Sequence, residues 1–388
     1  MKKIKVAEVI TRMDWGGSPD IFRIICSRLD PAVFDVYIIV GRTGHPTRKT
    51  KDFLEKFNDR IIFVDALVRD VHPVCDCAAW WSLYRLFRRE RFDIVHTHTA
   101  KAGALGRLAA FCAGVPAIIH TPHGHNFYGY FNRFISGMIV WIERFLSVLT
   151  TRVVVLTELE RQDYISLGVS DDKKTVAFPT AVEFEELMHC ARPRDEVRQL
   201  LGLPKAMTVV GFVGRLEPIK GTEYLLKAAR GVAGKRKDVI FVFMGEGSQR
   251  EWLAAQARAW GLGDQIKFVG WQENAAILMT SFDILVLPSL NEAVGLVLIE
   301  AQAQAVPVIA SRVGGIPEVV KDQETGILVP AQDPEALGAA IESLVNDPAR
   351  RNEMARRGQE FVKDKFGAGR LVERLSGVYR QMLKGRLR

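Results

Sequence analysis

The sequence predicts an α/β protein made of two doubly wound, Rossmann-like domains that face a central cleft. Short apolar, β-branched segments alternate with helical segments, which is typical of parallel sheets covered by helices on both faces. This alternation occurs twice, on either side of a charged, proline-containing stretch at 180–206. The chain of 388 residues is also too long for one ordinary hydrophobic core.

The first run of strands and helices lies in the N-terminal half of the chain. We expect strands at 5–10, 34–40, 61–64, 92–98, 117–121 and 152–156. We expect helices between them at 19–29, 48–57, 77–90, 101–113 and 131–148. These elements predict an N-terminal domain at 1–185, followed by a linker at 186–205.

The second run repeats the pattern. We expect strands at 208–214, 239–245, 266–270, 283–288, 306–311 and 326–330, again with helices between them. The predicted C-terminal domain covers 206–365, and a helix at 366–388 is free to pack back on the first domain. In doubly wound domains ligands bind at the carboxyl ends of the strands, so we look for the site there.

The composition narrows the functional classes. A hydrophobic share of 48% and a charged share of 25% are those of a packed globular protein. No stretch approaches the roughly 20 apolar residues of a membrane span, and the five scattered cysteines fit a reducing cytoplasm. The net charge of +8 favours an anionic partner, but no nucleic-acid recognition motif is present and the charge is spread out.

Two glycine-containing stretches follow predicted strands and are candidate anion sites. In "MDWGGSPD", residues 13–20, Gly16 and Gly17 precede a helix and allow close backbone approach. In "VGRLEPIKG", residues 213–221, Arg215 and Lys220 suit a diphosphate. The alternatives are a plain strand-to-helix turn for the first stretch and two solvated surface cations for the second.

The stretch "PSLNEAVGLVLIEAQAQAVPVIAS", residues 288–311, is apolar except for two acids. Glu292 lies in a predicted loop, and Glu300 lies on a helix expected from about Gly295 to Ala305. A carboxylate accepts hydrogen bonds from two neighbouring hydroxyls, so the two acids suit sugars, and the backbone amides at 293–296 add an anion site. The alternative, an acid that complements the helix dipole plus a half-exposed glutamate, explains Glu292 well and Glu300 poorly.

Five histidines lie at the ends of two presumptive neighbouring strands: His96, His98, His120, His123 and His125. Such clustering raises the possibility of a metal site. No acidic or cysteine ligand is expected nearby, so we predict that no metal is bound.

These motifs together resemble those of GT-B glycosyltransferases, and most closely the retaining, nucleotide-sugar-dependent family 4. In the second half the resemblance rests on Glu292 and Glu300 with seven residues between them, on "VGRLEPIKG" before them and on "VGGIPEVV…TGILVP" after them. In the first half, "WGG", "VHTHTAKAGALGRLAA" (95–110) and "HTPHGHNF" (120–127) resemble enzymes of exopolysaccharide, O-antigen and capsule synthesis. The resemblance spans nearly the whole chain, with the motifs in the expected order.

The resemblance implies a glycosyltransferase that moves a sugar from a nucleotide-diphosphate sugar to a hydroxyl of a lipid-linked or polysaccharide acceptor in cell-surface glycan biosynthesis. It favours a UDP-sugar donor, with a GDP-sugar as the second choice, and implies metal-independent chemistry. The expected location is the cytoplasm, with peripheral association at the inner face of the cell membrane. The basic segment 84–92 and the apolar, arginine-containing segment 131–152 favour such docking, while the alternative for 131–152 is a helix packed on its own sheet.

The resemblance implies that 1–185 is the acceptor-side domain and that 206–365 is the nucleotide-sugar-binding domain. It also assigns roles to residues of the second half. Arg215 and Lys220 would bind the donor diphosphate, and Glu300 would hold the ribose. Glu292, with the amides near Val294 and Gly295, would hold the hydroxyls of the donor sugar. The family usually has phenylalanine where this chain has Val294, so the sugar pocket is expected to differ in shape.

In the first half, the resemblance implies that Gly16 and Gly17 let the first loop approach the donor phosphates. His123 matches the active-site histidine, with His125 as the second choice and as an acceptor-side candidate. Lys101 is a further acceptor-side candidate. Two other functions remain open: a nucleotide-sugar 2-epimerase of the same fold, for which the chain lacks a convincing set of acid and base groups, and a non-catalytic nucleotide-sugar-binding protein, for which a degenerate site would be expected.

Overall fold

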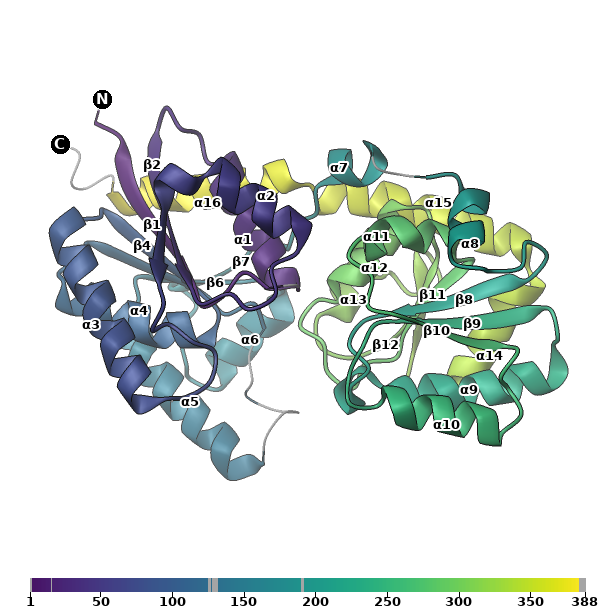
Figure 1. Ribbon diagram of the computed structural model, residues 1–388. Coiled ribbons are helices and arrows are strands. Elements are labelled where there is room, and N and C mark those ends of the chain that lie inside the picture. The colour runs from purple at the N-terminus through teal and green to yellow at the C-terminus, as the bar shows by residue number, and fades with distance from the viewer. Residues whose placement is uncertain (1, 15, 125–126, 128–131, 190–191, 384–388) are drawn as a thin grey trace. The chain divides into compact units, whose positions relative to one another are not determined.

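The computed structural model describes residues 2–14, 16–124, 127, 132–189 and 192–383 (Figure 1). Its contacts divide the chain into two compact units. The first unit joins Met1–Ala181 to Ala368–Arg388, and the second is Val182–Gly367. Two helices, α7 (Phe184–His189) and α8 (Arg194–Leu200), occupy the region expected to be a linker, and both belong to the second unit.

The first unit contains a seven-stranded parallel sheet with the order β3-β2-β1-β4-β5-β6-β7. Its strands are β1 (Ile4–Ile10), β2 (Phe34–Gly41), β3 (Ile61–Val64), β4 (Ile94–His98), β5 (Ala117–Thr121), β6 (Arg152–Val155) and β7 (Thr175–Ala177). All six strands that we expected are confirmed. β7 was not expected, because three residues are too few to show an alternating pattern.

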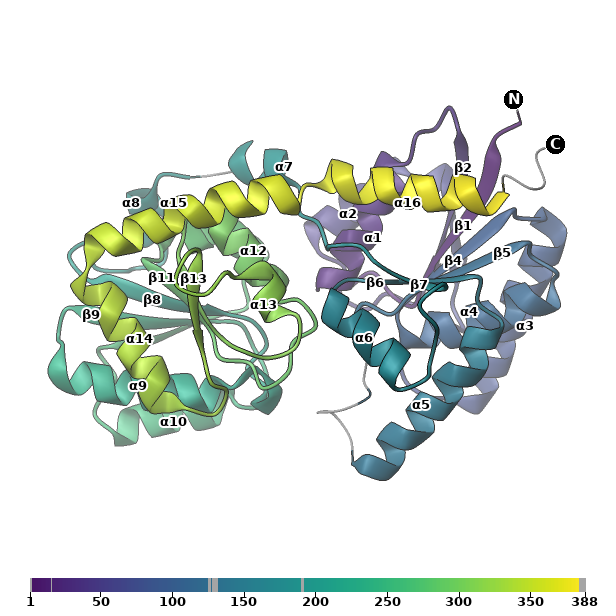
Figure 2. The same cartoon turned by 180° about the vertical axis from the view of Figure 1, so that it is seen from behind.

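Helices cover both faces of this sheet. They are α1 (Gly17–Arg28), α2 (Arg48–Lys56), α3 (Pro73–Glu90), α4 (Ala100–Cys112), α5 (Arg133–Val148), α6 (Glu158–Ser166) and the C-terminal α16 (Ala368–Leu383). Alternate residues of β1 point to opposite faces, so Val6 packs with α1 and α16, whereas Ala7 and Val9 pack with α3 and α4. Figure 2 shows α16 lying along α1 on its face of the sheet.

The second unit contains a six-stranded parallel sheet with the order β10-β9-β8-β11-β12-β13. Its strands are β8 (Thr208–Val213), β9 (Val239–Met244), β10 (Ile266–Gly270), β11 (Ile284–Leu287), β12 (Val308–Ser311) and β13 (Gly326–Val329). All six were expected. The helices are α9 (Thr222–Lys235), α10 (Arg250–Ala259), α11 (Ala275–Leu278), α12 (Leu296–Ala303), α13 (Ile316–Val319), α14 (Pro334–Asn346) and α15 (Pro348–Lys365).

Each sheet has one place where the strand order reverses. In the first sheet it lies between β1 and β4, and in the second between β8 and β11. The helices that follow these strands leave toward opposite faces, so the loops at the carboxyl ends open a crevice there. The predicted site residues follow these same strands, or strands next to them. Among the described residues, no helix combines the length and the apolar character that crossing a bilayer requires.

Candidate active site

The second unit brings two loops together at the reversal point of its sheet. Residues 214–221 follow β8 and residues 288–295 follow β11, and the Leu290 amide donates to the Ile219 carbonyl at 2.8 Å. Gly221 adopts a left-handed conformation with φ 66°, and a Cβ at this position would overlap the Pro288 carbonyl oxygen. Only glycine allows this approach, so the sequence dictates the contact between the two loops.

This contact places Lys220 against Glu292. The Lys220 ammonium forms an ion pair with Glu292 Oε2, and Ser289 Oγ donates to the same oxygen at 3.3 Å. The two charged side chains are only 19% and 15% exposed. From the loop after β12, the Gly315 amide donates to the Glu292 carbonyl at 3.1 Å, so the backbone of the glutamate is held as well.

The loop after β11 ends at the start of α12. The helix begins at Leu296, with Gly295 as its N-cap at φ 75°, and no side chain of the described residues caps it. Val294 and Gly295 are both buried. The amides of the first helical turn therefore lack side-chain acceptors close to Glu292, and such a helix end attracts an anion.

Arg215 and Glu300 lie on the same two chain segments. Arg215 lies two residues after the end of β8 and is exposed. Two hydrogen bonds from Ser248, and then the charge of Arg215, lower the pKa of Glu217 in this loop. Glu300 is half-buried on α12, in the helix that starts beside Glu292. The structure therefore brings Lys220 and Glu292 into contact and places Arg215 and Glu300 on the adjoining loop and helix.

Three candidate residues of the first unit, Gly16, Gly17 and Lys101, lie at the starts of helices. Gly16, with φ 137°, is the N-cap of α1, and Gly17 is its first residue; both are exposed. No side chain of the described residues caps this helix end. Lys101, in the first turn of α4, forms an ion pair with Asp76 of α3. His125 lies outside the described residues.

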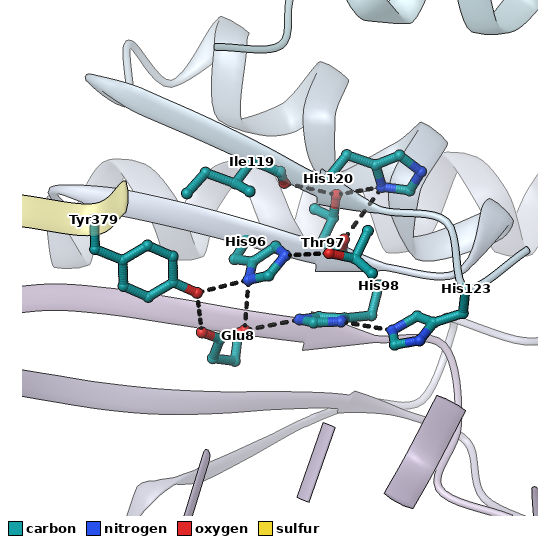
Figure 3. Close-up of polar contacts among 9 residues, drawn as sticks. Glu8, His96, Thr97, His98, Ile119, His120, His123 and Tyr379 are labelled. Carbon is teal, nitrogen blue, oxygen red and sulfur yellow. Dashed lines mark hydrogen bonds and ion pairs between the residues drawn. The ribbon is translucent and has the colours of Figure 1, made fainter. Parts of the chain in front are cut away.

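Four of the five histidines can be placed, and His98 and His123 belong to one buried hydrogen-bond chain (Figure 3). His98 Nε2 lies 2.8 Å from Glu8 Oε2, and His98 Nδ1 lies 2.9 Å from His123 Nε2. The Tyr379 hydroxyl, from α16, donates to Glu8 Oε1 at 2.6 Å. The glutamate, the tyrosine and His98 are essentially inaccessible to solvent.

Our expectation that no acid lies near the histidines was wrong. β1 and β4 are parallel neighbours, and their register pairs Glu8 with His96. The available signal was a carboxylate in the middle of the otherwise apolar segment "VAEVI", since a buried charge requires a partner. Tyr379 carried no local signal, because it reaches Glu8 across 371 residues of sequence.

The protonation states follow from burial and from these contacts. Burial alone would raise the pKa of Glu8, but His96 and His98 outweigh it and hold this pKa below its usual value. Burial lowers the pKa of His98 to about 4, although Glu8 opposes the shift. Burial also lowers the pKa of His123 well below its ordinary value. At neutral pH the hydrogen-bond chain therefore contains the ionised carboxylate of Glu8 and the uncharged imidazoles of His98 and His123.

The same carboxylate and two histidines have the spacing of a metal-ligand cluster. One ligand atom from each of Glu8, His96 and His98 falls within 4.8 Å of the others. These atoms are already engaged in hydrogen bonds with one another, with Tyr379 and with His123, so a metal would have to displace those bonds. Metal independence stays a prediction.

Two doubly wound parallel sheets, each with candidate residues at its reversal point, define an α/β protein of the GT-B type. Residues 193–361 match the family profile described as glycosyl transferases group 1, and residues 15–186 match glycosyltransferase family 4. The chain is 30% identical to the UDP-Gal:alpha-D-GlcNAc-diphosphoundecaprenol alpha-1,3-galactosyltransferase of Escherichia coli, over 90% of each protein.

Solved structures agree on the fold. The sucrose-phosphate synthase of Thermosynechococcus elongatus superposes with a TM-score of 0.81 at 21% identity, covering 99% of this chain and 100% of the other. HepE of Anabaena, solved in complex with UDP, superposes with a TM-score of 0.80 at 20% identity, covering 98% and 100%. The chain belongs to the GT-B glycosyltransferases, and its N-terminal region matches family 4, as the motifs indicated.

Proposed function

We propose that the protein transfers a sugar, with retention of anomeric configuration, from a UDP-sugar to a hydroxyl of a lipid-linked or polysaccharide acceptor in cell-surface glycan biosynthesis. The observation that carries this proposal is the contact between Lys220 and Glu292 beside the uncapped start of α12. A cation, a carboxylate and helix amides that no described side chain caps, all in one place, suit a ligand in which a diphosphate is bonded directly to a sugar.

In this proposal the second unit stabilises the departing nucleotide. Lys220, Arg215 and the amides at the start of α12 neutralise the negative charge that grows on the diphosphate as the glycosidic bond breaks. Glu292 accepts hydrogen bonds from hydroxyls of the donor sugar, and Glu300 holds the ribose. Because the charge on the diphosphate is larger in the transition state than in the bound donor, the contacts with the diphosphate accelerate the reaction rather than only binding the donor.

The bond changes fit attack on the face that the nucleotide leaves. The bond from the anomeric carbon to the diphosphate oxygen breaks, and a bond to the acceptor oxygen forms. The acceptor proton passes to the departing diphosphate. A covalent intermediate would need a free carboxylate, but Glu292 is engaged by Lys220 and Ser289. Proton NMR of the product should show the anomeric configuration of the donor, and an inverted product would refute this part of the proposal.

The choice of substrates is supported by relatives. The E. coli relative is named for a UDP-galactose donor and a diphosphoundecaprenol-linked acceptor, and HepE was solved with UDP. Calorimetry against UDP-, GDP- and ADP-sugars tests the donor, and we expect UDP-sugars to bind most tightly. A preference for GDP-sugars would replace this donor assignment. Formation of a new epimer from a UDP-sugar alone would favour the epimerase alternative.

The site assignment is tested by replacing its cations and acids. Arg215→Ala and Glu300→Ala should each weaken UDP-sugar binding about tenfold or more, the usual effect of losing a charge-assisted hydrogen bond. Arg258→Ala is a matched control, because it removes the same charge from an exposed position on α10. Unchanged donor affinity in the first two variants would contradict the assignment.

We also propose that the first unit docks on the inner face of the cell membrane through α5. This helix buries Ser136, Leu146 and Ser147, but six of its large apolar side chains are exposed. The exposed stripe consists of Phe134, Met138, Trp141, Ile142, Phe145 and Val148, which are 39–83% exposed. A helix that serves only to cover its own sheet would bury this stripe instead.

Basic side chains accompany the stripe. Arg133 and Arg144 are exposed on α5 itself. α3 and α5 both pack against α4, and α3 exposes Arg85 and Arg88 beside a groove of about 910 Å³ between α3 and β3. Exposed apolar rings flanked by arginines complement the acyl boundary and the negative headgroups of an anionic membrane.

Flotation with liposomes tests the docking. The protein should float with liposomes that contain phosphatidylglycerol at low salt, and less with neutral liposomes or at high salt. The double variant Trp141→Ser, Phe145→Ser should lose flotation. Trp252→Ser, at an exposed position on α10, is the matched control. Absence of flotation at low salt would refute the proposal.

A further inference from the structure

We propose that Glu8, held by Tyr379, is a positioning residue that acts through His98 to present the Nδ1 lone pair of His123 to a hydroxyl of the sugar substrate. The inference rests on the proposed function, because it takes His123 as the histidine that contacts substrate. It adds which nitrogen is used, which hydrogen-bonding role that nitrogen has, and which residues impose the role.

The direction of each hydrogen bond follows from the chemistry of the groups. A carboxylate can only accept, so His98 Nε2 must carry a proton and donate to Glu8 at 2.8 Å. A neutral imidazole has one N–H, so His98 Nδ1 is an acceptor. His123 Nε2, 2.9 Å away, must therefore be the donor of the next bond. One bare lone pair remains, on His123 Nδ1.

These bond directions hold when His98 and His123 are uncharged and Glu8 is ionised. Burial keeps His98 and His123 neutral at physiological pH, since both have a lowered pKa. The two imidazoles beside Glu8 lower the pKa of its carboxyl group and so keep it ionised. Phe22 packs edge-on against His98, with 5.1 Å between ring centroids, and limits rotation of the ring. The tautomers are therefore determined by contacts and not left to solvent.

His123, the last residue of the hydrogen-bond chain, has two features that indicate a ligand. His123 Nδ1 is buried and has no hydrogen-bond partner within the part of the chain that the structure describes. His123 also has φ 58°, a left-handed conformation that is uncommon for a residue with a Cβ. Backbone strain together with an unsatisfied polar atom occurs where function compensates for the cost. A hydroxyl that donates to Nδ1 would satisfy it.

Tyr379, at the other end of the hydrogen-bond chain, immobilises the carboxylate of Glu8. Tyr379 donates to Glu8 Oε1 at 2.6 Å, while His98 occupies Oε2. The tyrosine oxygen also lies 2.6 Å from His96 Nδ1, and His96 Nε2 lies 2.8 Å from Thr121 Oγ1. Both carboxylate oxygens are thus engaged, and Figure 3 shows the chain from Tyr379 to His123.

The role of the nitrogen defines what it recognises. A bare Nδ1 attracts a hydrogen-bond donor and repels a phosphate or carbonyl oxygen. We therefore assign His123 to a sugar hydroxyl and not to the diphosphate. A UDP-sugar in which that hydroxyl is replaced by hydrogen should be transferred more slowly than the intact UDP-sugar. Binding of UDP, which lacks the donor sugar, should not depend on His123.

The test is Glu8→Gln, which keeps the shape of the side chain but supplies an amide N–H₂ that can donate to His98. Long-range proton–nitrogen NMR of the full chain reports the tautomer of each histidine. In the wild type we expect His123 to be protonated at Nε2. In the variant we expect a shift toward protonation at Nδ1 and a fall in kcat of about tenfold or more. The calorimetric Kd for UDP should stay within about twofold.

Two further variants keep the test decisive. Tyr379→Phe removes only a hydroxyl and should lower kcat less than Glu8→Gln, because His98 retains its bond to the carboxylate. Cys26→Ala is the control, because Cys26 is buried within electrostatic reach of Glu8 and takes no part in the chain of hydrogen bonds. It should change neither the His123 tautomer nor kcat.

A wild-type tautomer and wild-type kcat in Glu8→Gln would overturn the proposal, and so would equal losses in Glu8→Gln and Cys26→Ala without a change of tautomer. His123→Ala separates this failure from that of the proposed function. If His123→Ala abolishes transfer while Glu8→Gln does not, only the positioning role is wrong. If His123→Ala leaves transfer intact, the assignment of His123 itself is wrong.

Discussion

At the scale of residues, the pair formed by Lys220 and Glu292 joins two loops separated by 72 positions in the sequence. Removing two charges from water costs about as much as their attraction returns, so a shielded ion pair adds little to stability. The proposed function gives the pair a role in ligand binding. In that proposal it holds a cation and a carboxylate in defined places before a donor with adjoining diphosphate and sugar arrives.

Lys220→Ala should weaken binding of a UDP-sugar by about 10- to 100-fold, because a charge-assisted hydrogen bond to the diphosphate is lost and Glu292 is left uncompensated. Isothermal titration calorimetry measures the change. Lys227→Ala, which removes the same charge from the exposed face of α9, should leave the affinity unchanged. Equal affinities in the two variants would argue against a diphosphate contact at Lys220.

Whether sugar transfer needs a metal ion also depends on a few residues. We expect exhaustive treatment with a chelator to leave sugar transfer unchanged, because the proposed function assigns neutralisation of the diphosphate charge to Arg215, Lys220 and the start of α12. The rate should be measured with and without EDTA, and after adding Mg²⁺, Mn²⁺ or Zn²⁺. Loss of activity with EDTA that a metal restores would point instead to the cluster of Glu8, His96 and His98.

At the scale of elements, α16 and α5 contrast in what they bury. α16 buries its large residues, including Leu371, Leu375 and Tyr379, in the core that it shares with α1 and β1. α5 buries Leu146 and two serines but exposes six of its large apolar residues. Hydrophobic burial thus makes α16 part of the first unit despite its position at the end of the chain, whereas α5 carries the exposed apolar stripe to which the proposal assigns membrane docking.

Leu375→Ala should therefore destabilise the first unit by about 2–5 kcal/mol, the usual cost of a cavity at a fully buried leucine. Hydrogen exchange followed by mass spectrometry should show faster exchange in β1 and β4 and unchanged exchange in β8 and β11. Leu200→Ala is the control, because Leu200 is 66% exposed on α8. Similar effects of the two substitutions would contradict the role given to α16.

At the scale of the whole molecule, the buried histidines should make stability depend on pH. His98, His120 and His123 all have a pKa lowered by burial, from an ordinary value of 6.5. Between pH 6.5 and about 4, the unfolded chain therefore binds more protons than the folded one. The lowered pKa of Glu8 acts in the same direction below its ordinary value of 4.5.

The free energy of unfolding should consequently fall as the pH drops from 6.5 toward 4.5, by up to about 1.4 kcal/mol per pH unit for each such histidine. Urea unfolding at several pH values measures the slope. His98→Asn should reduce it. His45→Gln should not, because Asp14 holds the His45 backbone amide and no buried role is assigned to its side chain. Constant stability across this range would refute the assigned protonation states.

The alternation of strands and helices could be predicted because it depends on local periodicity, which each segment carries by itself. All twelve expected strands are present. β7 and α6 escaped prediction, since one is too short and the other, "ELERQDYIS", has no clear apolar stripe. The boundary was also displaced, because membership of a compact unit depends on contacts and not on composition. For that reason Ala368–Arg388 belongs with the first unit.

The class of protein could be inferred without coordinates, from the order of the strands and from motifs whose residue types match phosphate and sugar chemistry. Only the tertiary structure showed that Glu8 and Tyr379 support His98 and His123. Strand register and the return of the C-terminal helix create those contacts, and both result from packing between segments far apart in the chain. Periodicity is a property of neighbours in sequence, whereas the protonation of a buried imidazole depends on neighbours in space.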